Sequence, residues 1–231
     1  MPTPPVKQLA QVFGPREFAA GFRVSRETTE RLEIYADRLR FWQKTINLVA
    51  PNTLDAVWRR HFADSAQLVD HIPAATRTVV DVGSGAGFPG LVLAILLADR
   101  VAESGCRVVL IESDSRKAAF LADVVRHTGV GTAIAVDILC QRVEAVATRA
   151  RVGSVDIVTA RALAPLDRLL TWLSPLFGPD TRGLFLKGRD VEVEMAKAVQ
   201  RWRITYDLVP SRTDPYGRIV VVRQLAAKTE G

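Results

Sequence analysis

The 231-residue sequence has little cysteine and histidine, with two residues of the first and three of the second. Cys106 and Cys140 are too few for a disulfide framework, and reduced thiols in a cytoplasmic chain are expected. No Cys and His residues have the spacing of metal ligands, so no metal site is expected. The longest apolar run, residues 91–98, is far shorter than the roughly 20 residues of a membrane span. Residues 1–11 hold no apolar core, so neither a signal peptide nor a membrane partner is expected.

The composition is that of a folded domain with a basic charge balance. Apolar residues make up 48% and charged residues 24%, which excludes a disordered or collagen-like chain. Lys and Arg total 31 against 25 for Asp and Glu, a net charge of +6. A basic balance favours a polyanionic partner such as nucleic acid, because cationic surfaces speed the encounter. Charge alone does not identify that partner.

The first third of the chain predicts helices. Ser25 is placed as a helix N-cap. One apolar helix face follows at steps of three and four residues, formed by Leu32, Tyr35, Leu39, Trp42 and Ile46. A second helix, capped by Asn52 or Thr53, is expected to carry the apolar residues Leu54, Trp58, Phe62, Leu68 and Val69. Residues 1–22 hold four of the twelve prolines and predict no firm element. We therefore expect an N-terminal helical cap over residues 1–72 and a single compact main domain over residues 73–231.

The main domain alternates between β-branched runs and helical patterns. The runs cover residues 78–82, 107–113, 133–138, 155–159 and 183–186. Helical stretches cover residues 89–98, 115–126, 143–149, 165–176 and 191–202. This alternation predicts an α/β fold, with a parallel sheet and helices on both faces. Only turn residues separate the last two runs, residues 204–209 and 218–222, so these strands should form an antiparallel hairpin and complete a seven-stranded sheet.

A glycine-rich loop follows the first predicted strand. Gly85, Gly87 and Gly90 satisfy the G-x-G-x-x-G pattern, which by itself suggests a dinucleotide pyrophosphate. However, the glycines begin at Gly83, directly after the strand, and Asp81 lies at the strand end. A carboxylate there would repel a pyrophosphate but favour a ligand with an ammonium group, such as S-adenosylmethionine. The alternative is an ordinary turn between a strand and a helix.

A second acid, Glu112, ends the next predicted strand. In α/β nucleotide folds, a carboxylate at this place contacts the ribose hydroxyl groups. The acid is expected for NAD as well as for S-adenosylmethionine, so it does not separate these two ligands. It could also simply cap the helix that begins near Ser115.

Several motifs together resemble one protein family. Besides the stretch from Asp81 to Gly90, they are Asn47-Leu48, Arg60-His61-Phe62-Ala63-Asp64-Ser65, Glu112-Ser113, Arg142-Val143-Glu144, Arg161-Ala162 and Leu186-Lys187-Gly188. On these residues the chain resembles the class I methyltransferases and, more closely, the RsmG family, also called glucose-inhibited division protein B. Relatives tend to carry Arg-His before the last strand, where this chain has Gly217-Arg218.

The resemblance implies a fold, a reaction and a set of binding residues. The fold would be the Rossmann-like, seven-stranded sheet of class I methyltransferases. The enzyme would transfer a methyl group from S-adenosylmethionine to N7 of a specific guanine in 16S ribosomal RNA. The cofactor pocket would include Gly83, Phe88, Val143, Glu144 and Arg161. The glycines Gly85 and Gly87 and the acids Asp81 and Glu112 are added to this set from the loop and strand pattern.

Methylation at N7 makes few chemical demands on the protein. N7 carries an in-plane lone pair and no proton, so no general base is needed. An exocyclic-amine methyltransferase would carry an Asp/Asn-Pro-Pro-Tyr motif at the end of the fourth strand. Here that strand ends in Thr159-Ala160-Arg161-Ala162 instead. Positioning should therefore supply most of the rate. Arg161 and Lys187, expected at the ends of neighbouring strands, could donate to guanine O6, to a phosphate or, for Arg161, to the cofactor carboxylate.

Other candidate residues and functions remain open at this point. Arg142 could reach a phosphate, and Asn47 could bind a base or only cap a helix. Arg59, Arg60 and His61 could face RNA or close the pocket, or Arg60 and Asp64 could pair within one helix. The expected partner is 16S ribosomal RNA or the small ribosomal subunit, and no DNA partner is expected. We expect the protein to be a monomer in the cytoplasm. The alternatives are an NAD-dependent oxidoreductase using the same loop and a non-catalytic RNA-binding module.

Overall fold

The computed structural model describes residues 12–100, 105–146 and 152–228. A seven-stranded sheet forms its centre, in the order β3-β2-β1-β4-β5-β7-β6. The strands are β1 (Thr78–Val82), β2 (Arg107–Glu112), β3 (Ala135–Cys140), β4 (Ile157–Arg161), β5 (Arg182–Lys187), β6 (Trp202–Pro210) and β7 (Arg218–Ala227). The first five are parallel, while β7 runs antiparallel to both β5 and β6. The predicted α/β sheet and its terminal hairpin are confirmed.

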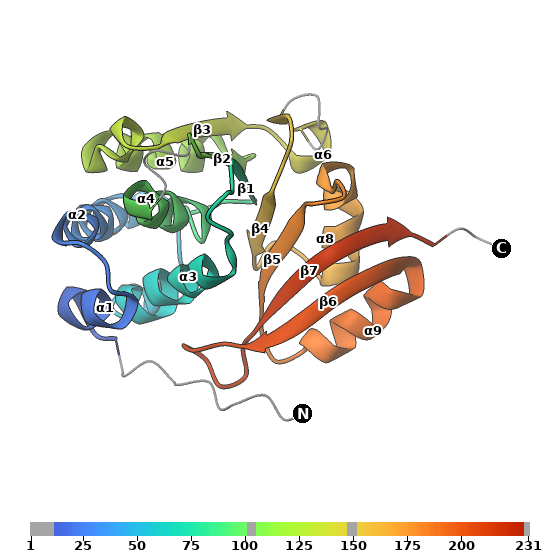
Figure 1. Ribbon diagram of the computed structural model, residues 1–231. Helices are drawn as coiled ribbons and strands as arrows, with labels where there is room; N and C mark the ends of the chain where they lie inside the picture. The colour runs from blue at the N-terminus through green and yellow to red at the C-terminus, as the bar shows by residue number, and fades with distance from the viewer. Residues whose placement is uncertain (1–11, 101–104, 147–151, 229–231) are drawn as a thin grey trace.

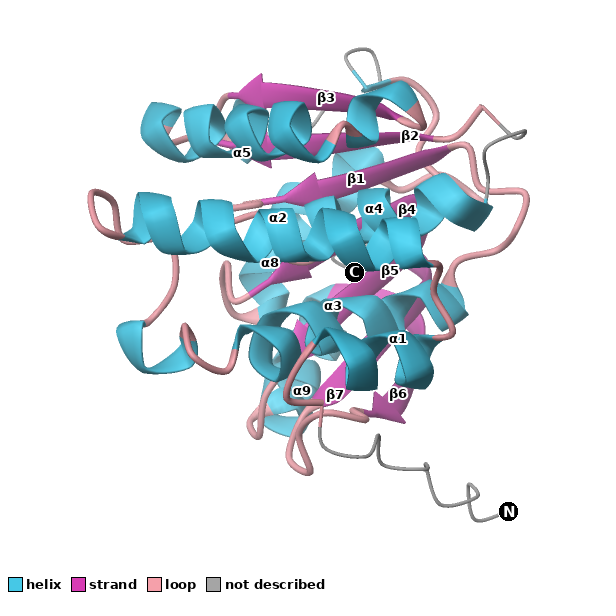
Figure 2. Cartoon of the chain, turned by 90° about the vertical axis from the view of Figure 1, so that its left-hand side faces the viewer, coloured by secondary structure: helices cyan, strands magenta, loops and turns pink. Residues whose placement is uncertain are grey.

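Helices cover both faces of the sheet (Figures 1 and 2). One face carries α1 (Pro15–Phe22), α2 (Arg26–Gln43), α3 (Asp64–Ala66), α4 (Gly90–Arg100) and α5 (Ser115–Thr128). The other carries α6 (Val143–Val146), α8 (Leu166–Leu173) and α9 (Val191–Arg201). Alternate strand residues supply the two cores: Val79 belongs to the first and Val80 to the second. The last residues of the helix predicted over 143–149 lie outside the described part of the chain.

Helix α2 joins the N-terminal segment to the sheet. Ser25 is its N-cap, as predicted, because its side chain accepts a hydrogen bond from the Thr28 N–H at 3.0 Å. The buried face of α2 packs in the same core as α4 and α5. Tyr35 on this face stacks on Phe88 and donates its hydroxyl proton to the Ala86 carbonyl. The helix therefore supports the glycine loop directly.

The N-terminal segment differs from the prediction in two ways. Residues 15–22 form helix α1 where no element was predicted, with Pro15 in the first turn, where its missing N–H costs nothing. The second predicted helix is irregular: a 3₁₀ turn (Pro51–Thr53), the π-helical segment η2 (Trp58–Ala63), α3, and a second 3₁₀ turn (Gln67–His71). Apolar residues four positions apart, such as Trp58 and Phe62, occur in α- and π-turns alike, so the apolar pattern did not distinguish the two kinds of helix.

The remaining boundaries shift by a few residues. Strand β3 begins at Ala135 because a 3₁₀ turn occupies Val130–Thr132. The helix predicted over 165–176 is α8 followed by a 3₁₀ turn at Ser174–Leu176. Both hairpin strands are longer than predicted, with a bulge between Thr205 and Tyr206. Within the described residues, no helix combines the length and apolar character needed to cross a membrane.

Candidate functional site

The carboxyl ends of the parallel strands form the candidate site. Arg161 ends β4 beside Leu186, the neighbour of Lys187 at the end of β5. Three cavities lined by described residues lie at this edge, and Arg161 lines all three. Ligands of open α/β sheets bind at such an edge. We name these three cavities after the segments that surround them: the glycine-loop cavity, the cap cavity and the hairpin cavity.

The glycine-loop cavity, about 360 Å³, lies between the loop after β1 and the segments after β2, β3 and β4. It brings together seven residues predicted for the site: Gly83, Gly85, Glu112, Arg142, Val143, Glu144 and Arg161. Lys117, Leu163, Arg168 and Trp172 complete much of its wall, and sequence reasoning gave none of them a role in the site. Lys117 belongs to a stretch, Arg116-Lys117, that matches the family, whereas the only sequence signal of the other three is their position after the fourth strand.

Gly83 begins the loop in a backbone conformation that favours glycine. Its φ angle is +67°, a conformation that side chains disfavour, and an added Cβ would lie 2.6 Å from Cδ1 of Leu163. The N–H groups of Gly83 and Ser84 both donate to the Ile111 carbonyl, at 2.9 and 3.0 Å. These bonds hold the loop against the end of β2. Both N–H groups are thus engaged within the protein, and Gly83 lines the glycine-loop cavity.

Glu112 ties the loop to the next strand. One carboxylate oxygen accepts the Gly85 N–H at 2.7 Å, and the other accepts the Asp114 N–H at 2.8 Å. The side chain is 7% exposed and lines the glycine-loop cavity. Each carboxylate oxygen has a second lone pair, so Glu112 can still accept from a ligand hydroxyl.

Asp81 lies beneath the loop instead of lining the cavity. Its side chain is fully buried and accepts the Thr159 hydroxyl proton at 2.7 Å. Burial raises the pKa of this carboxyl to about 6, although hydrogen bonds from Thr159 and Ser84 partly offset the effect. An added Cβ on Gly90 would lie 2.6 Å from its Oδ2, so α4 begins directly against it. Asp81 thus anchors the loop from the core side.

Phe88 and Gly87 also face the core. Phe88 is 3% exposed and stacks between Tyr35 and His61, with ring centroids 5.4 and 4.8 Å away. Gly87 passes so close to the Tyr35 hydroxyl that a side chain would not fit. Among the described residues that line the three cavities, neither appears. The structure therefore places them behind the site, where they connect the loop to the N-terminal helices.

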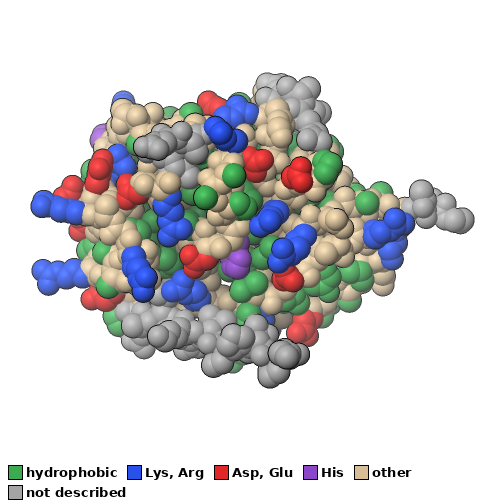
Figure 3. Space-filling model, viewed as in Figure 1, with side chains coloured by type: hydrophobic (Ala, Val, Ile, Leu, Met, Phe, Trp, Pro, Cys, Tyr) green, Lys and Arg blue, Asp and Glu red, His purple; other side chains and the backbone are tan. Residues whose placement is uncertain are grey.

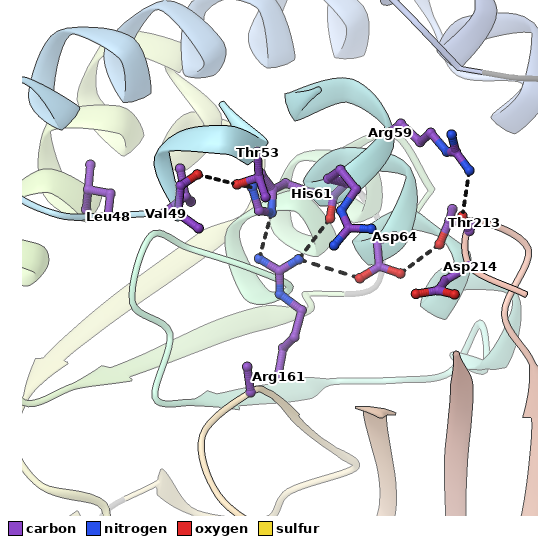
Figure 4. A pocket seen from close by; sticks show the side chains of 12 residues that line it. Leu48, Val49, Thr53, Arg59, His61, Asp64, Arg161, Thr213 and Asp214 are labelled. Atoms are coloured by element: carbon purple, nitrogen blue, oxygen red, sulfur yellow. Dashed lines mark hydrogen bonds and ion pairs between the residues drawn. The ribbon is translucent and has the colours of Figure 1, made fainter. Parts of the chain in front are cut away.

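Arg161 is held by the π-helical segment η2 (Figure 4). Its guanidinium donates to the Arg60 carbonyl at 3.2 Å and to Nδ1 of His61 at 3.1 Å. The same group lies 3.5 Å from Oδ2 of Asp64 and 4.8 Å from the ring centroid of Phe88. The Arg60–Asp64 pair considered from the sequence does not occur among the described ion pairs; Asp64 pairs with Arg161 instead.

The bond from Arg161 fixes the protonation of His61. A guanidinium only donates, so Nδ1 of His61 must accept and Nε2 must carry the proton. Burial, together with the charges of Arg161 and Arg60, lowers the pKa of His61 to about 3, which keeps the ring neutral. Nε2 then donates to the Thr53 hydroxyl at 2.9 Å, and that hydroxyl donates to the Ala50 carbonyl at 2.7 Å.

The cap cavity, about 340 Å³, contains this network in its wall. Asp64 also accepts the Thr213 hydroxyl proton at 2.8 Å, so the network reaches the β6–β7 turn. Burial raises the pKa of Asp64, while the Arg161 charge and the Thr213 bond lower it. Sequence reasoning missed these partners of Arg161, although the Arg-His-x-x-Asp-Ser motif that contains Arg60, His61 and Asp64 was visible.

Lys187 faces the hairpin cavity, about 460 Å³, at the predicted end of β5. Its ammonium donates to the Ala164 carbonyl and to Glu194, both at 2.7 Å. Glu194 also accepts the Leu166 N–H at 2.7 Å, which fixes the start of α8. Because an ammonium has three N–H donors, one remains for a ligand. Glu194 is a further residue of the site that the sequence did not indicate.

Asn47 does not line these cavities, although the next residue, Leu48, lines the cap cavity. It is exposed in the loop after α2, where its Oδ1 is 3.5 Å from Nε2 of Gln43. It is absent from the described lining of the three cavities. The structure therefore does not bring Asn47 together with Arg161 and Lys187. In the parts of the chain that the structure describes, no three His, Cys, Asp or Glu side chains could hold a metal ion.

Solved structures share this fold at low sequence identity. A SAM-dependent methyltransferase from Aquifex aeolicus aligns with a TM-score of 0.53 and 16% identity, over 81% of this chain and 97% of that chain. A TehB-like SAM-dependent methyltransferase from Corynebacterium glutamicum aligns with a TM-score of 0.53 and 12% identity, over 82% and 98%. These likenesses confirm the predicted class I methyltransferase fold.

Sequence relatives identify the family. The chain matches the model of the GidB family, rRNA small subunit methyltransferase G, over residues 28–212. It is 48% identical to ribosomal RNA small subunit methyltransferase G of Parvibaculum lavamentivorans over 93% of this chain and 91% of that protein. It is 51% identical to the protein of that name from Methylobacterium radiotolerans, over 90% and 93%. The chain belongs to the rRNA small subunit methyltransferase G family.

Proposed function

We propose that this protein transfers a methyl group from S-adenosylmethionine to N7 of a specific guanine in 16S ribosomal RNA. The observation that carries the proposal is the meeting of the glycine-loop and hairpin cavities at Arg161. A donor in the first cavity and a base in the second would meet beside Arg161, which lines both cavities. Family membership supports an enzyme of this kind and favours neither a NAD-dependent oxidoreductase nor a non-catalytic module.

The glycine-loop cavity suits S-adenosylmethionine, which supplies an electrophilic methyl group on a sulfonium. Gly83 lets the Leu163 side chain pack against the loop where a Cβ would lie, and Glu112 offers free lone pairs for ribose hydroxyls. Val143 and Glu144 form the wall beyond Glu112. Arg142 stands beside them and is exposed, where it could reach a phosphate.

The hairpin cavity suits the guanine. The free N–H of Lys187 can donate to O6, while Glu194 and the Ala164 carbonyl keep its ammonium in place. Arg161 keeps its orientation through His61 and Asp64, so it borders both cavities without donating to N7. A donor to N7 would occupy the attacking lone pair. The chain therefore contributes position and charge, and the base itself is the nucleophile.

Finer features of the activity belong to the same proposal. The protein would act as a monomer in the cytoplasm, where ribosomes are assembled, on RNA and not on DNA. Its basic balance of 31 Lys and Arg against 25 Asp and Glu supports a polyanionic substrate.

Two measurements test the proposal. S-adenosylmethionine and its demethylated product should raise the melting midpoint of the protein, whereas NADH should not. Radiolabelled methyl transfer to unmethylated 16S RNA, or to small subunits, should yield 7-methylguanine at one position. Stabilisation by NADH alone, or a methyl group on any atom other than N7, would overturn the assignment.

A further inference from the structure

An exposed aromatic side chain lies on the β6–β7 turn, beyond the residues assigned above. Tyr216 is 60% exposed, although most aromatic side chains of the described chain are buried or partly buried. The guanidinium of Arg189, from the turn after β5, lies 4.4 Å from the centroid of its ring. Two turns at the same sheet edge therefore meet at this ring. One face of the ring carries a cation, and much of the remainder is open.

The β6–β7 turn holds Tyr216 in place. The Ser211 hydroxyl oxygen accepts the N–H groups of Thr213 and Asp214, each at 3.2 Å. Oδ1 of Asp214 accepts the N–H of Tyr216 at 2.9 Å, and the Gly217 carbonyl accepts the N–H of Ser211 at 3.0 Å. A turn that is already ordered loses little conformational entropy when a ligand binds. Rigid aromatic side chains are effective contact residues for that reason.

Arg189 and Tyr216 are next in the chain to residues that line the hairpin cavity. Gly188 and Gly217, their neighbours in the chain, line this cavity together with Lys187. Asp214 of the same turn lines both the hairpin and the cap cavity, as Figure 4 shows for the second. A nucleotide next to a base in the hairpin cavity would therefore reach the Tyr216 ring.

The chemistry of the pair fits RNA. Aromatic rings stack on unpaired bases, and arginine guanidinium groups bind phosphates. Arg189 is exposed, and none of the described ion pairs engages it. Lys and Arg side chains are spread over this side of the molecule, with Asp and Glu among them (Figure 3). We propose that Tyr216 and Arg189 form a stacking site for a nucleobase that flanks the methylated guanine, an inference that rests on the proposed function.

The test compares two tyrosines of the same hairpin. Tyr206, on β6, is 37% exposed and belongs to the described lining of none of the three cavities. We expect Tyr216→Ala to weaken equilibrium binding of protein-free 16S RNA about tenfold, the scale of one lost base stack. Tyr216→Phe, which keeps the ring, and the control Tyr206→Ala should stay within about twofold of the unchanged protein. The melting shift produced by S-adenosylmethionine should persist in all three variants.

The outcomes separate the two proposals. Equal RNA affinity of Tyr216→Ala and Tyr206→Ala overturns the stacking site, and methylation of the RNA by the unchanged protein then leaves the proposed function standing. A loss seen only with assembled subunits, and not with protein-free RNA, also overturns it, because the ring would then contact a ribosomal protein. Absence of methylation by the unchanged protein overturns the proposed function and this inference with it.

Discussion

Gly83 determines the shape of the glycine loop through the side chain that it lacks. It combines a positive φ angle with a Leu163 methyl group where a Cβ would lie. Gly129, at the end of α5, has a similar φ of +63° but nothing within 4 Å of an added Cβ. Comparing substitutions at Gly83 and Gly129 therefore distinguishes the effect of backbone strain from that of crowding around the added Cβ.

We expect Gly83→Ala to weaken S-adenosylmethionine binding by about tenfold, because Leu163 and the loop must shift into the cavity. Gly129→Ala should lower the free energy of unfolding by about 1 kcal/mol through the φ angle alone and leave cofactor affinity unchanged. Calorimetric titration and chemical denaturation of both variants give these numbers. An unaltered dissociation constant for Gly83→Ala would place the donor elsewhere.

His61 shows how a buried ring can be kept neutral for a structural purpose. Its pKa of about 3 in the folded protein lies below the ordinary value of 6.5. As the pH falls below 6.5, the unfolded chain binds a proton at this residue while the folded chain does not. The stability contributed by neutral His61 is therefore fully present above that pH and is lost as the pH falls toward 3.

His61→Asn retains a neutral acceptor for Arg161 but cannot titrate. Between about pH 8 and about pH 5, we expect the unchanged protein to lose about 2 kcal/mol of unfolding free energy relative to this variant. Asp81, whose pKa is raised, contributes with the opposite sign, but it is present in both proteins and cancels in the comparison. Parallel curves of stability against pH would show that His61 is protonated in the folded state.

The residues of the glycine-loop cavity were largely accessible from the sequence, whereas those around Arg161 were not. Gly83 and Glu112 carry local signals, a loop and a strand end. The partner of Asp64 could not be found locally, because Arg60 stands four residues away and offers a plausible helical pair. The actual partner, Arg161, comes from a distant strand through tertiary packing.

At the scale of elements, the sheet was predictable because buried parallel strands are short β-branched runs bounded by loops. The hairpin followed from its turn residues. The π-helical form of the segment Trp58–Ala63 was not predictable, because π-turns satisfy the same apolar spacing as an α-helix. That segment presents the Arg60 carbonyl, His61 and Asp64 to Arg161 together. An irregular helix thus carries much of the site.

Helix α2 supports the site from behind through Tyr35. We expect Tyr35→Phe to leave the Ala86 carbonyl unpaired, costing about 1–2 kcal/mol of stability and weakening S-adenosylmethionine binding severalfold. Ser25→Ala removes the N-cap of the same helix, at a similar cost of about 1 kcal/mol, but far from the loop. The affinity of the Ser25→Ala variant for S-adenosylmethionine should not change. If both variants bind the cofactor equally well, α2 contributes stability only.

At the scale of the whole molecule, the net charge of +6 predicts how RNA binding responds to salt. We expect affinity for 16S RNA to fall at least about tenfold between about 50 and about 200 mM salt, as two or more phosphate contacts require. Cofactor affinity should change less than about twofold over the same range, because its cavity is small and partly enclosed. A flat salt response would mean that the basic residues do not contact phosphates.

The position of Arg161 between two cavities bears on how the reaction ends. Alkylation at N7 leaves guanine positively charged, while the donor loses its sulfonium charge. In the proposed arrangement, a cation is thereby created beside Arg161 and Lys187, which line the same cavity. Asp64 and Glu194, which pair with these two cations, line the same cavity, so the new positive charge meets carboxylates as well as cations. The two ion pairs would thus limit the electrostatic cost of creating a further cation at this edge of the sheet.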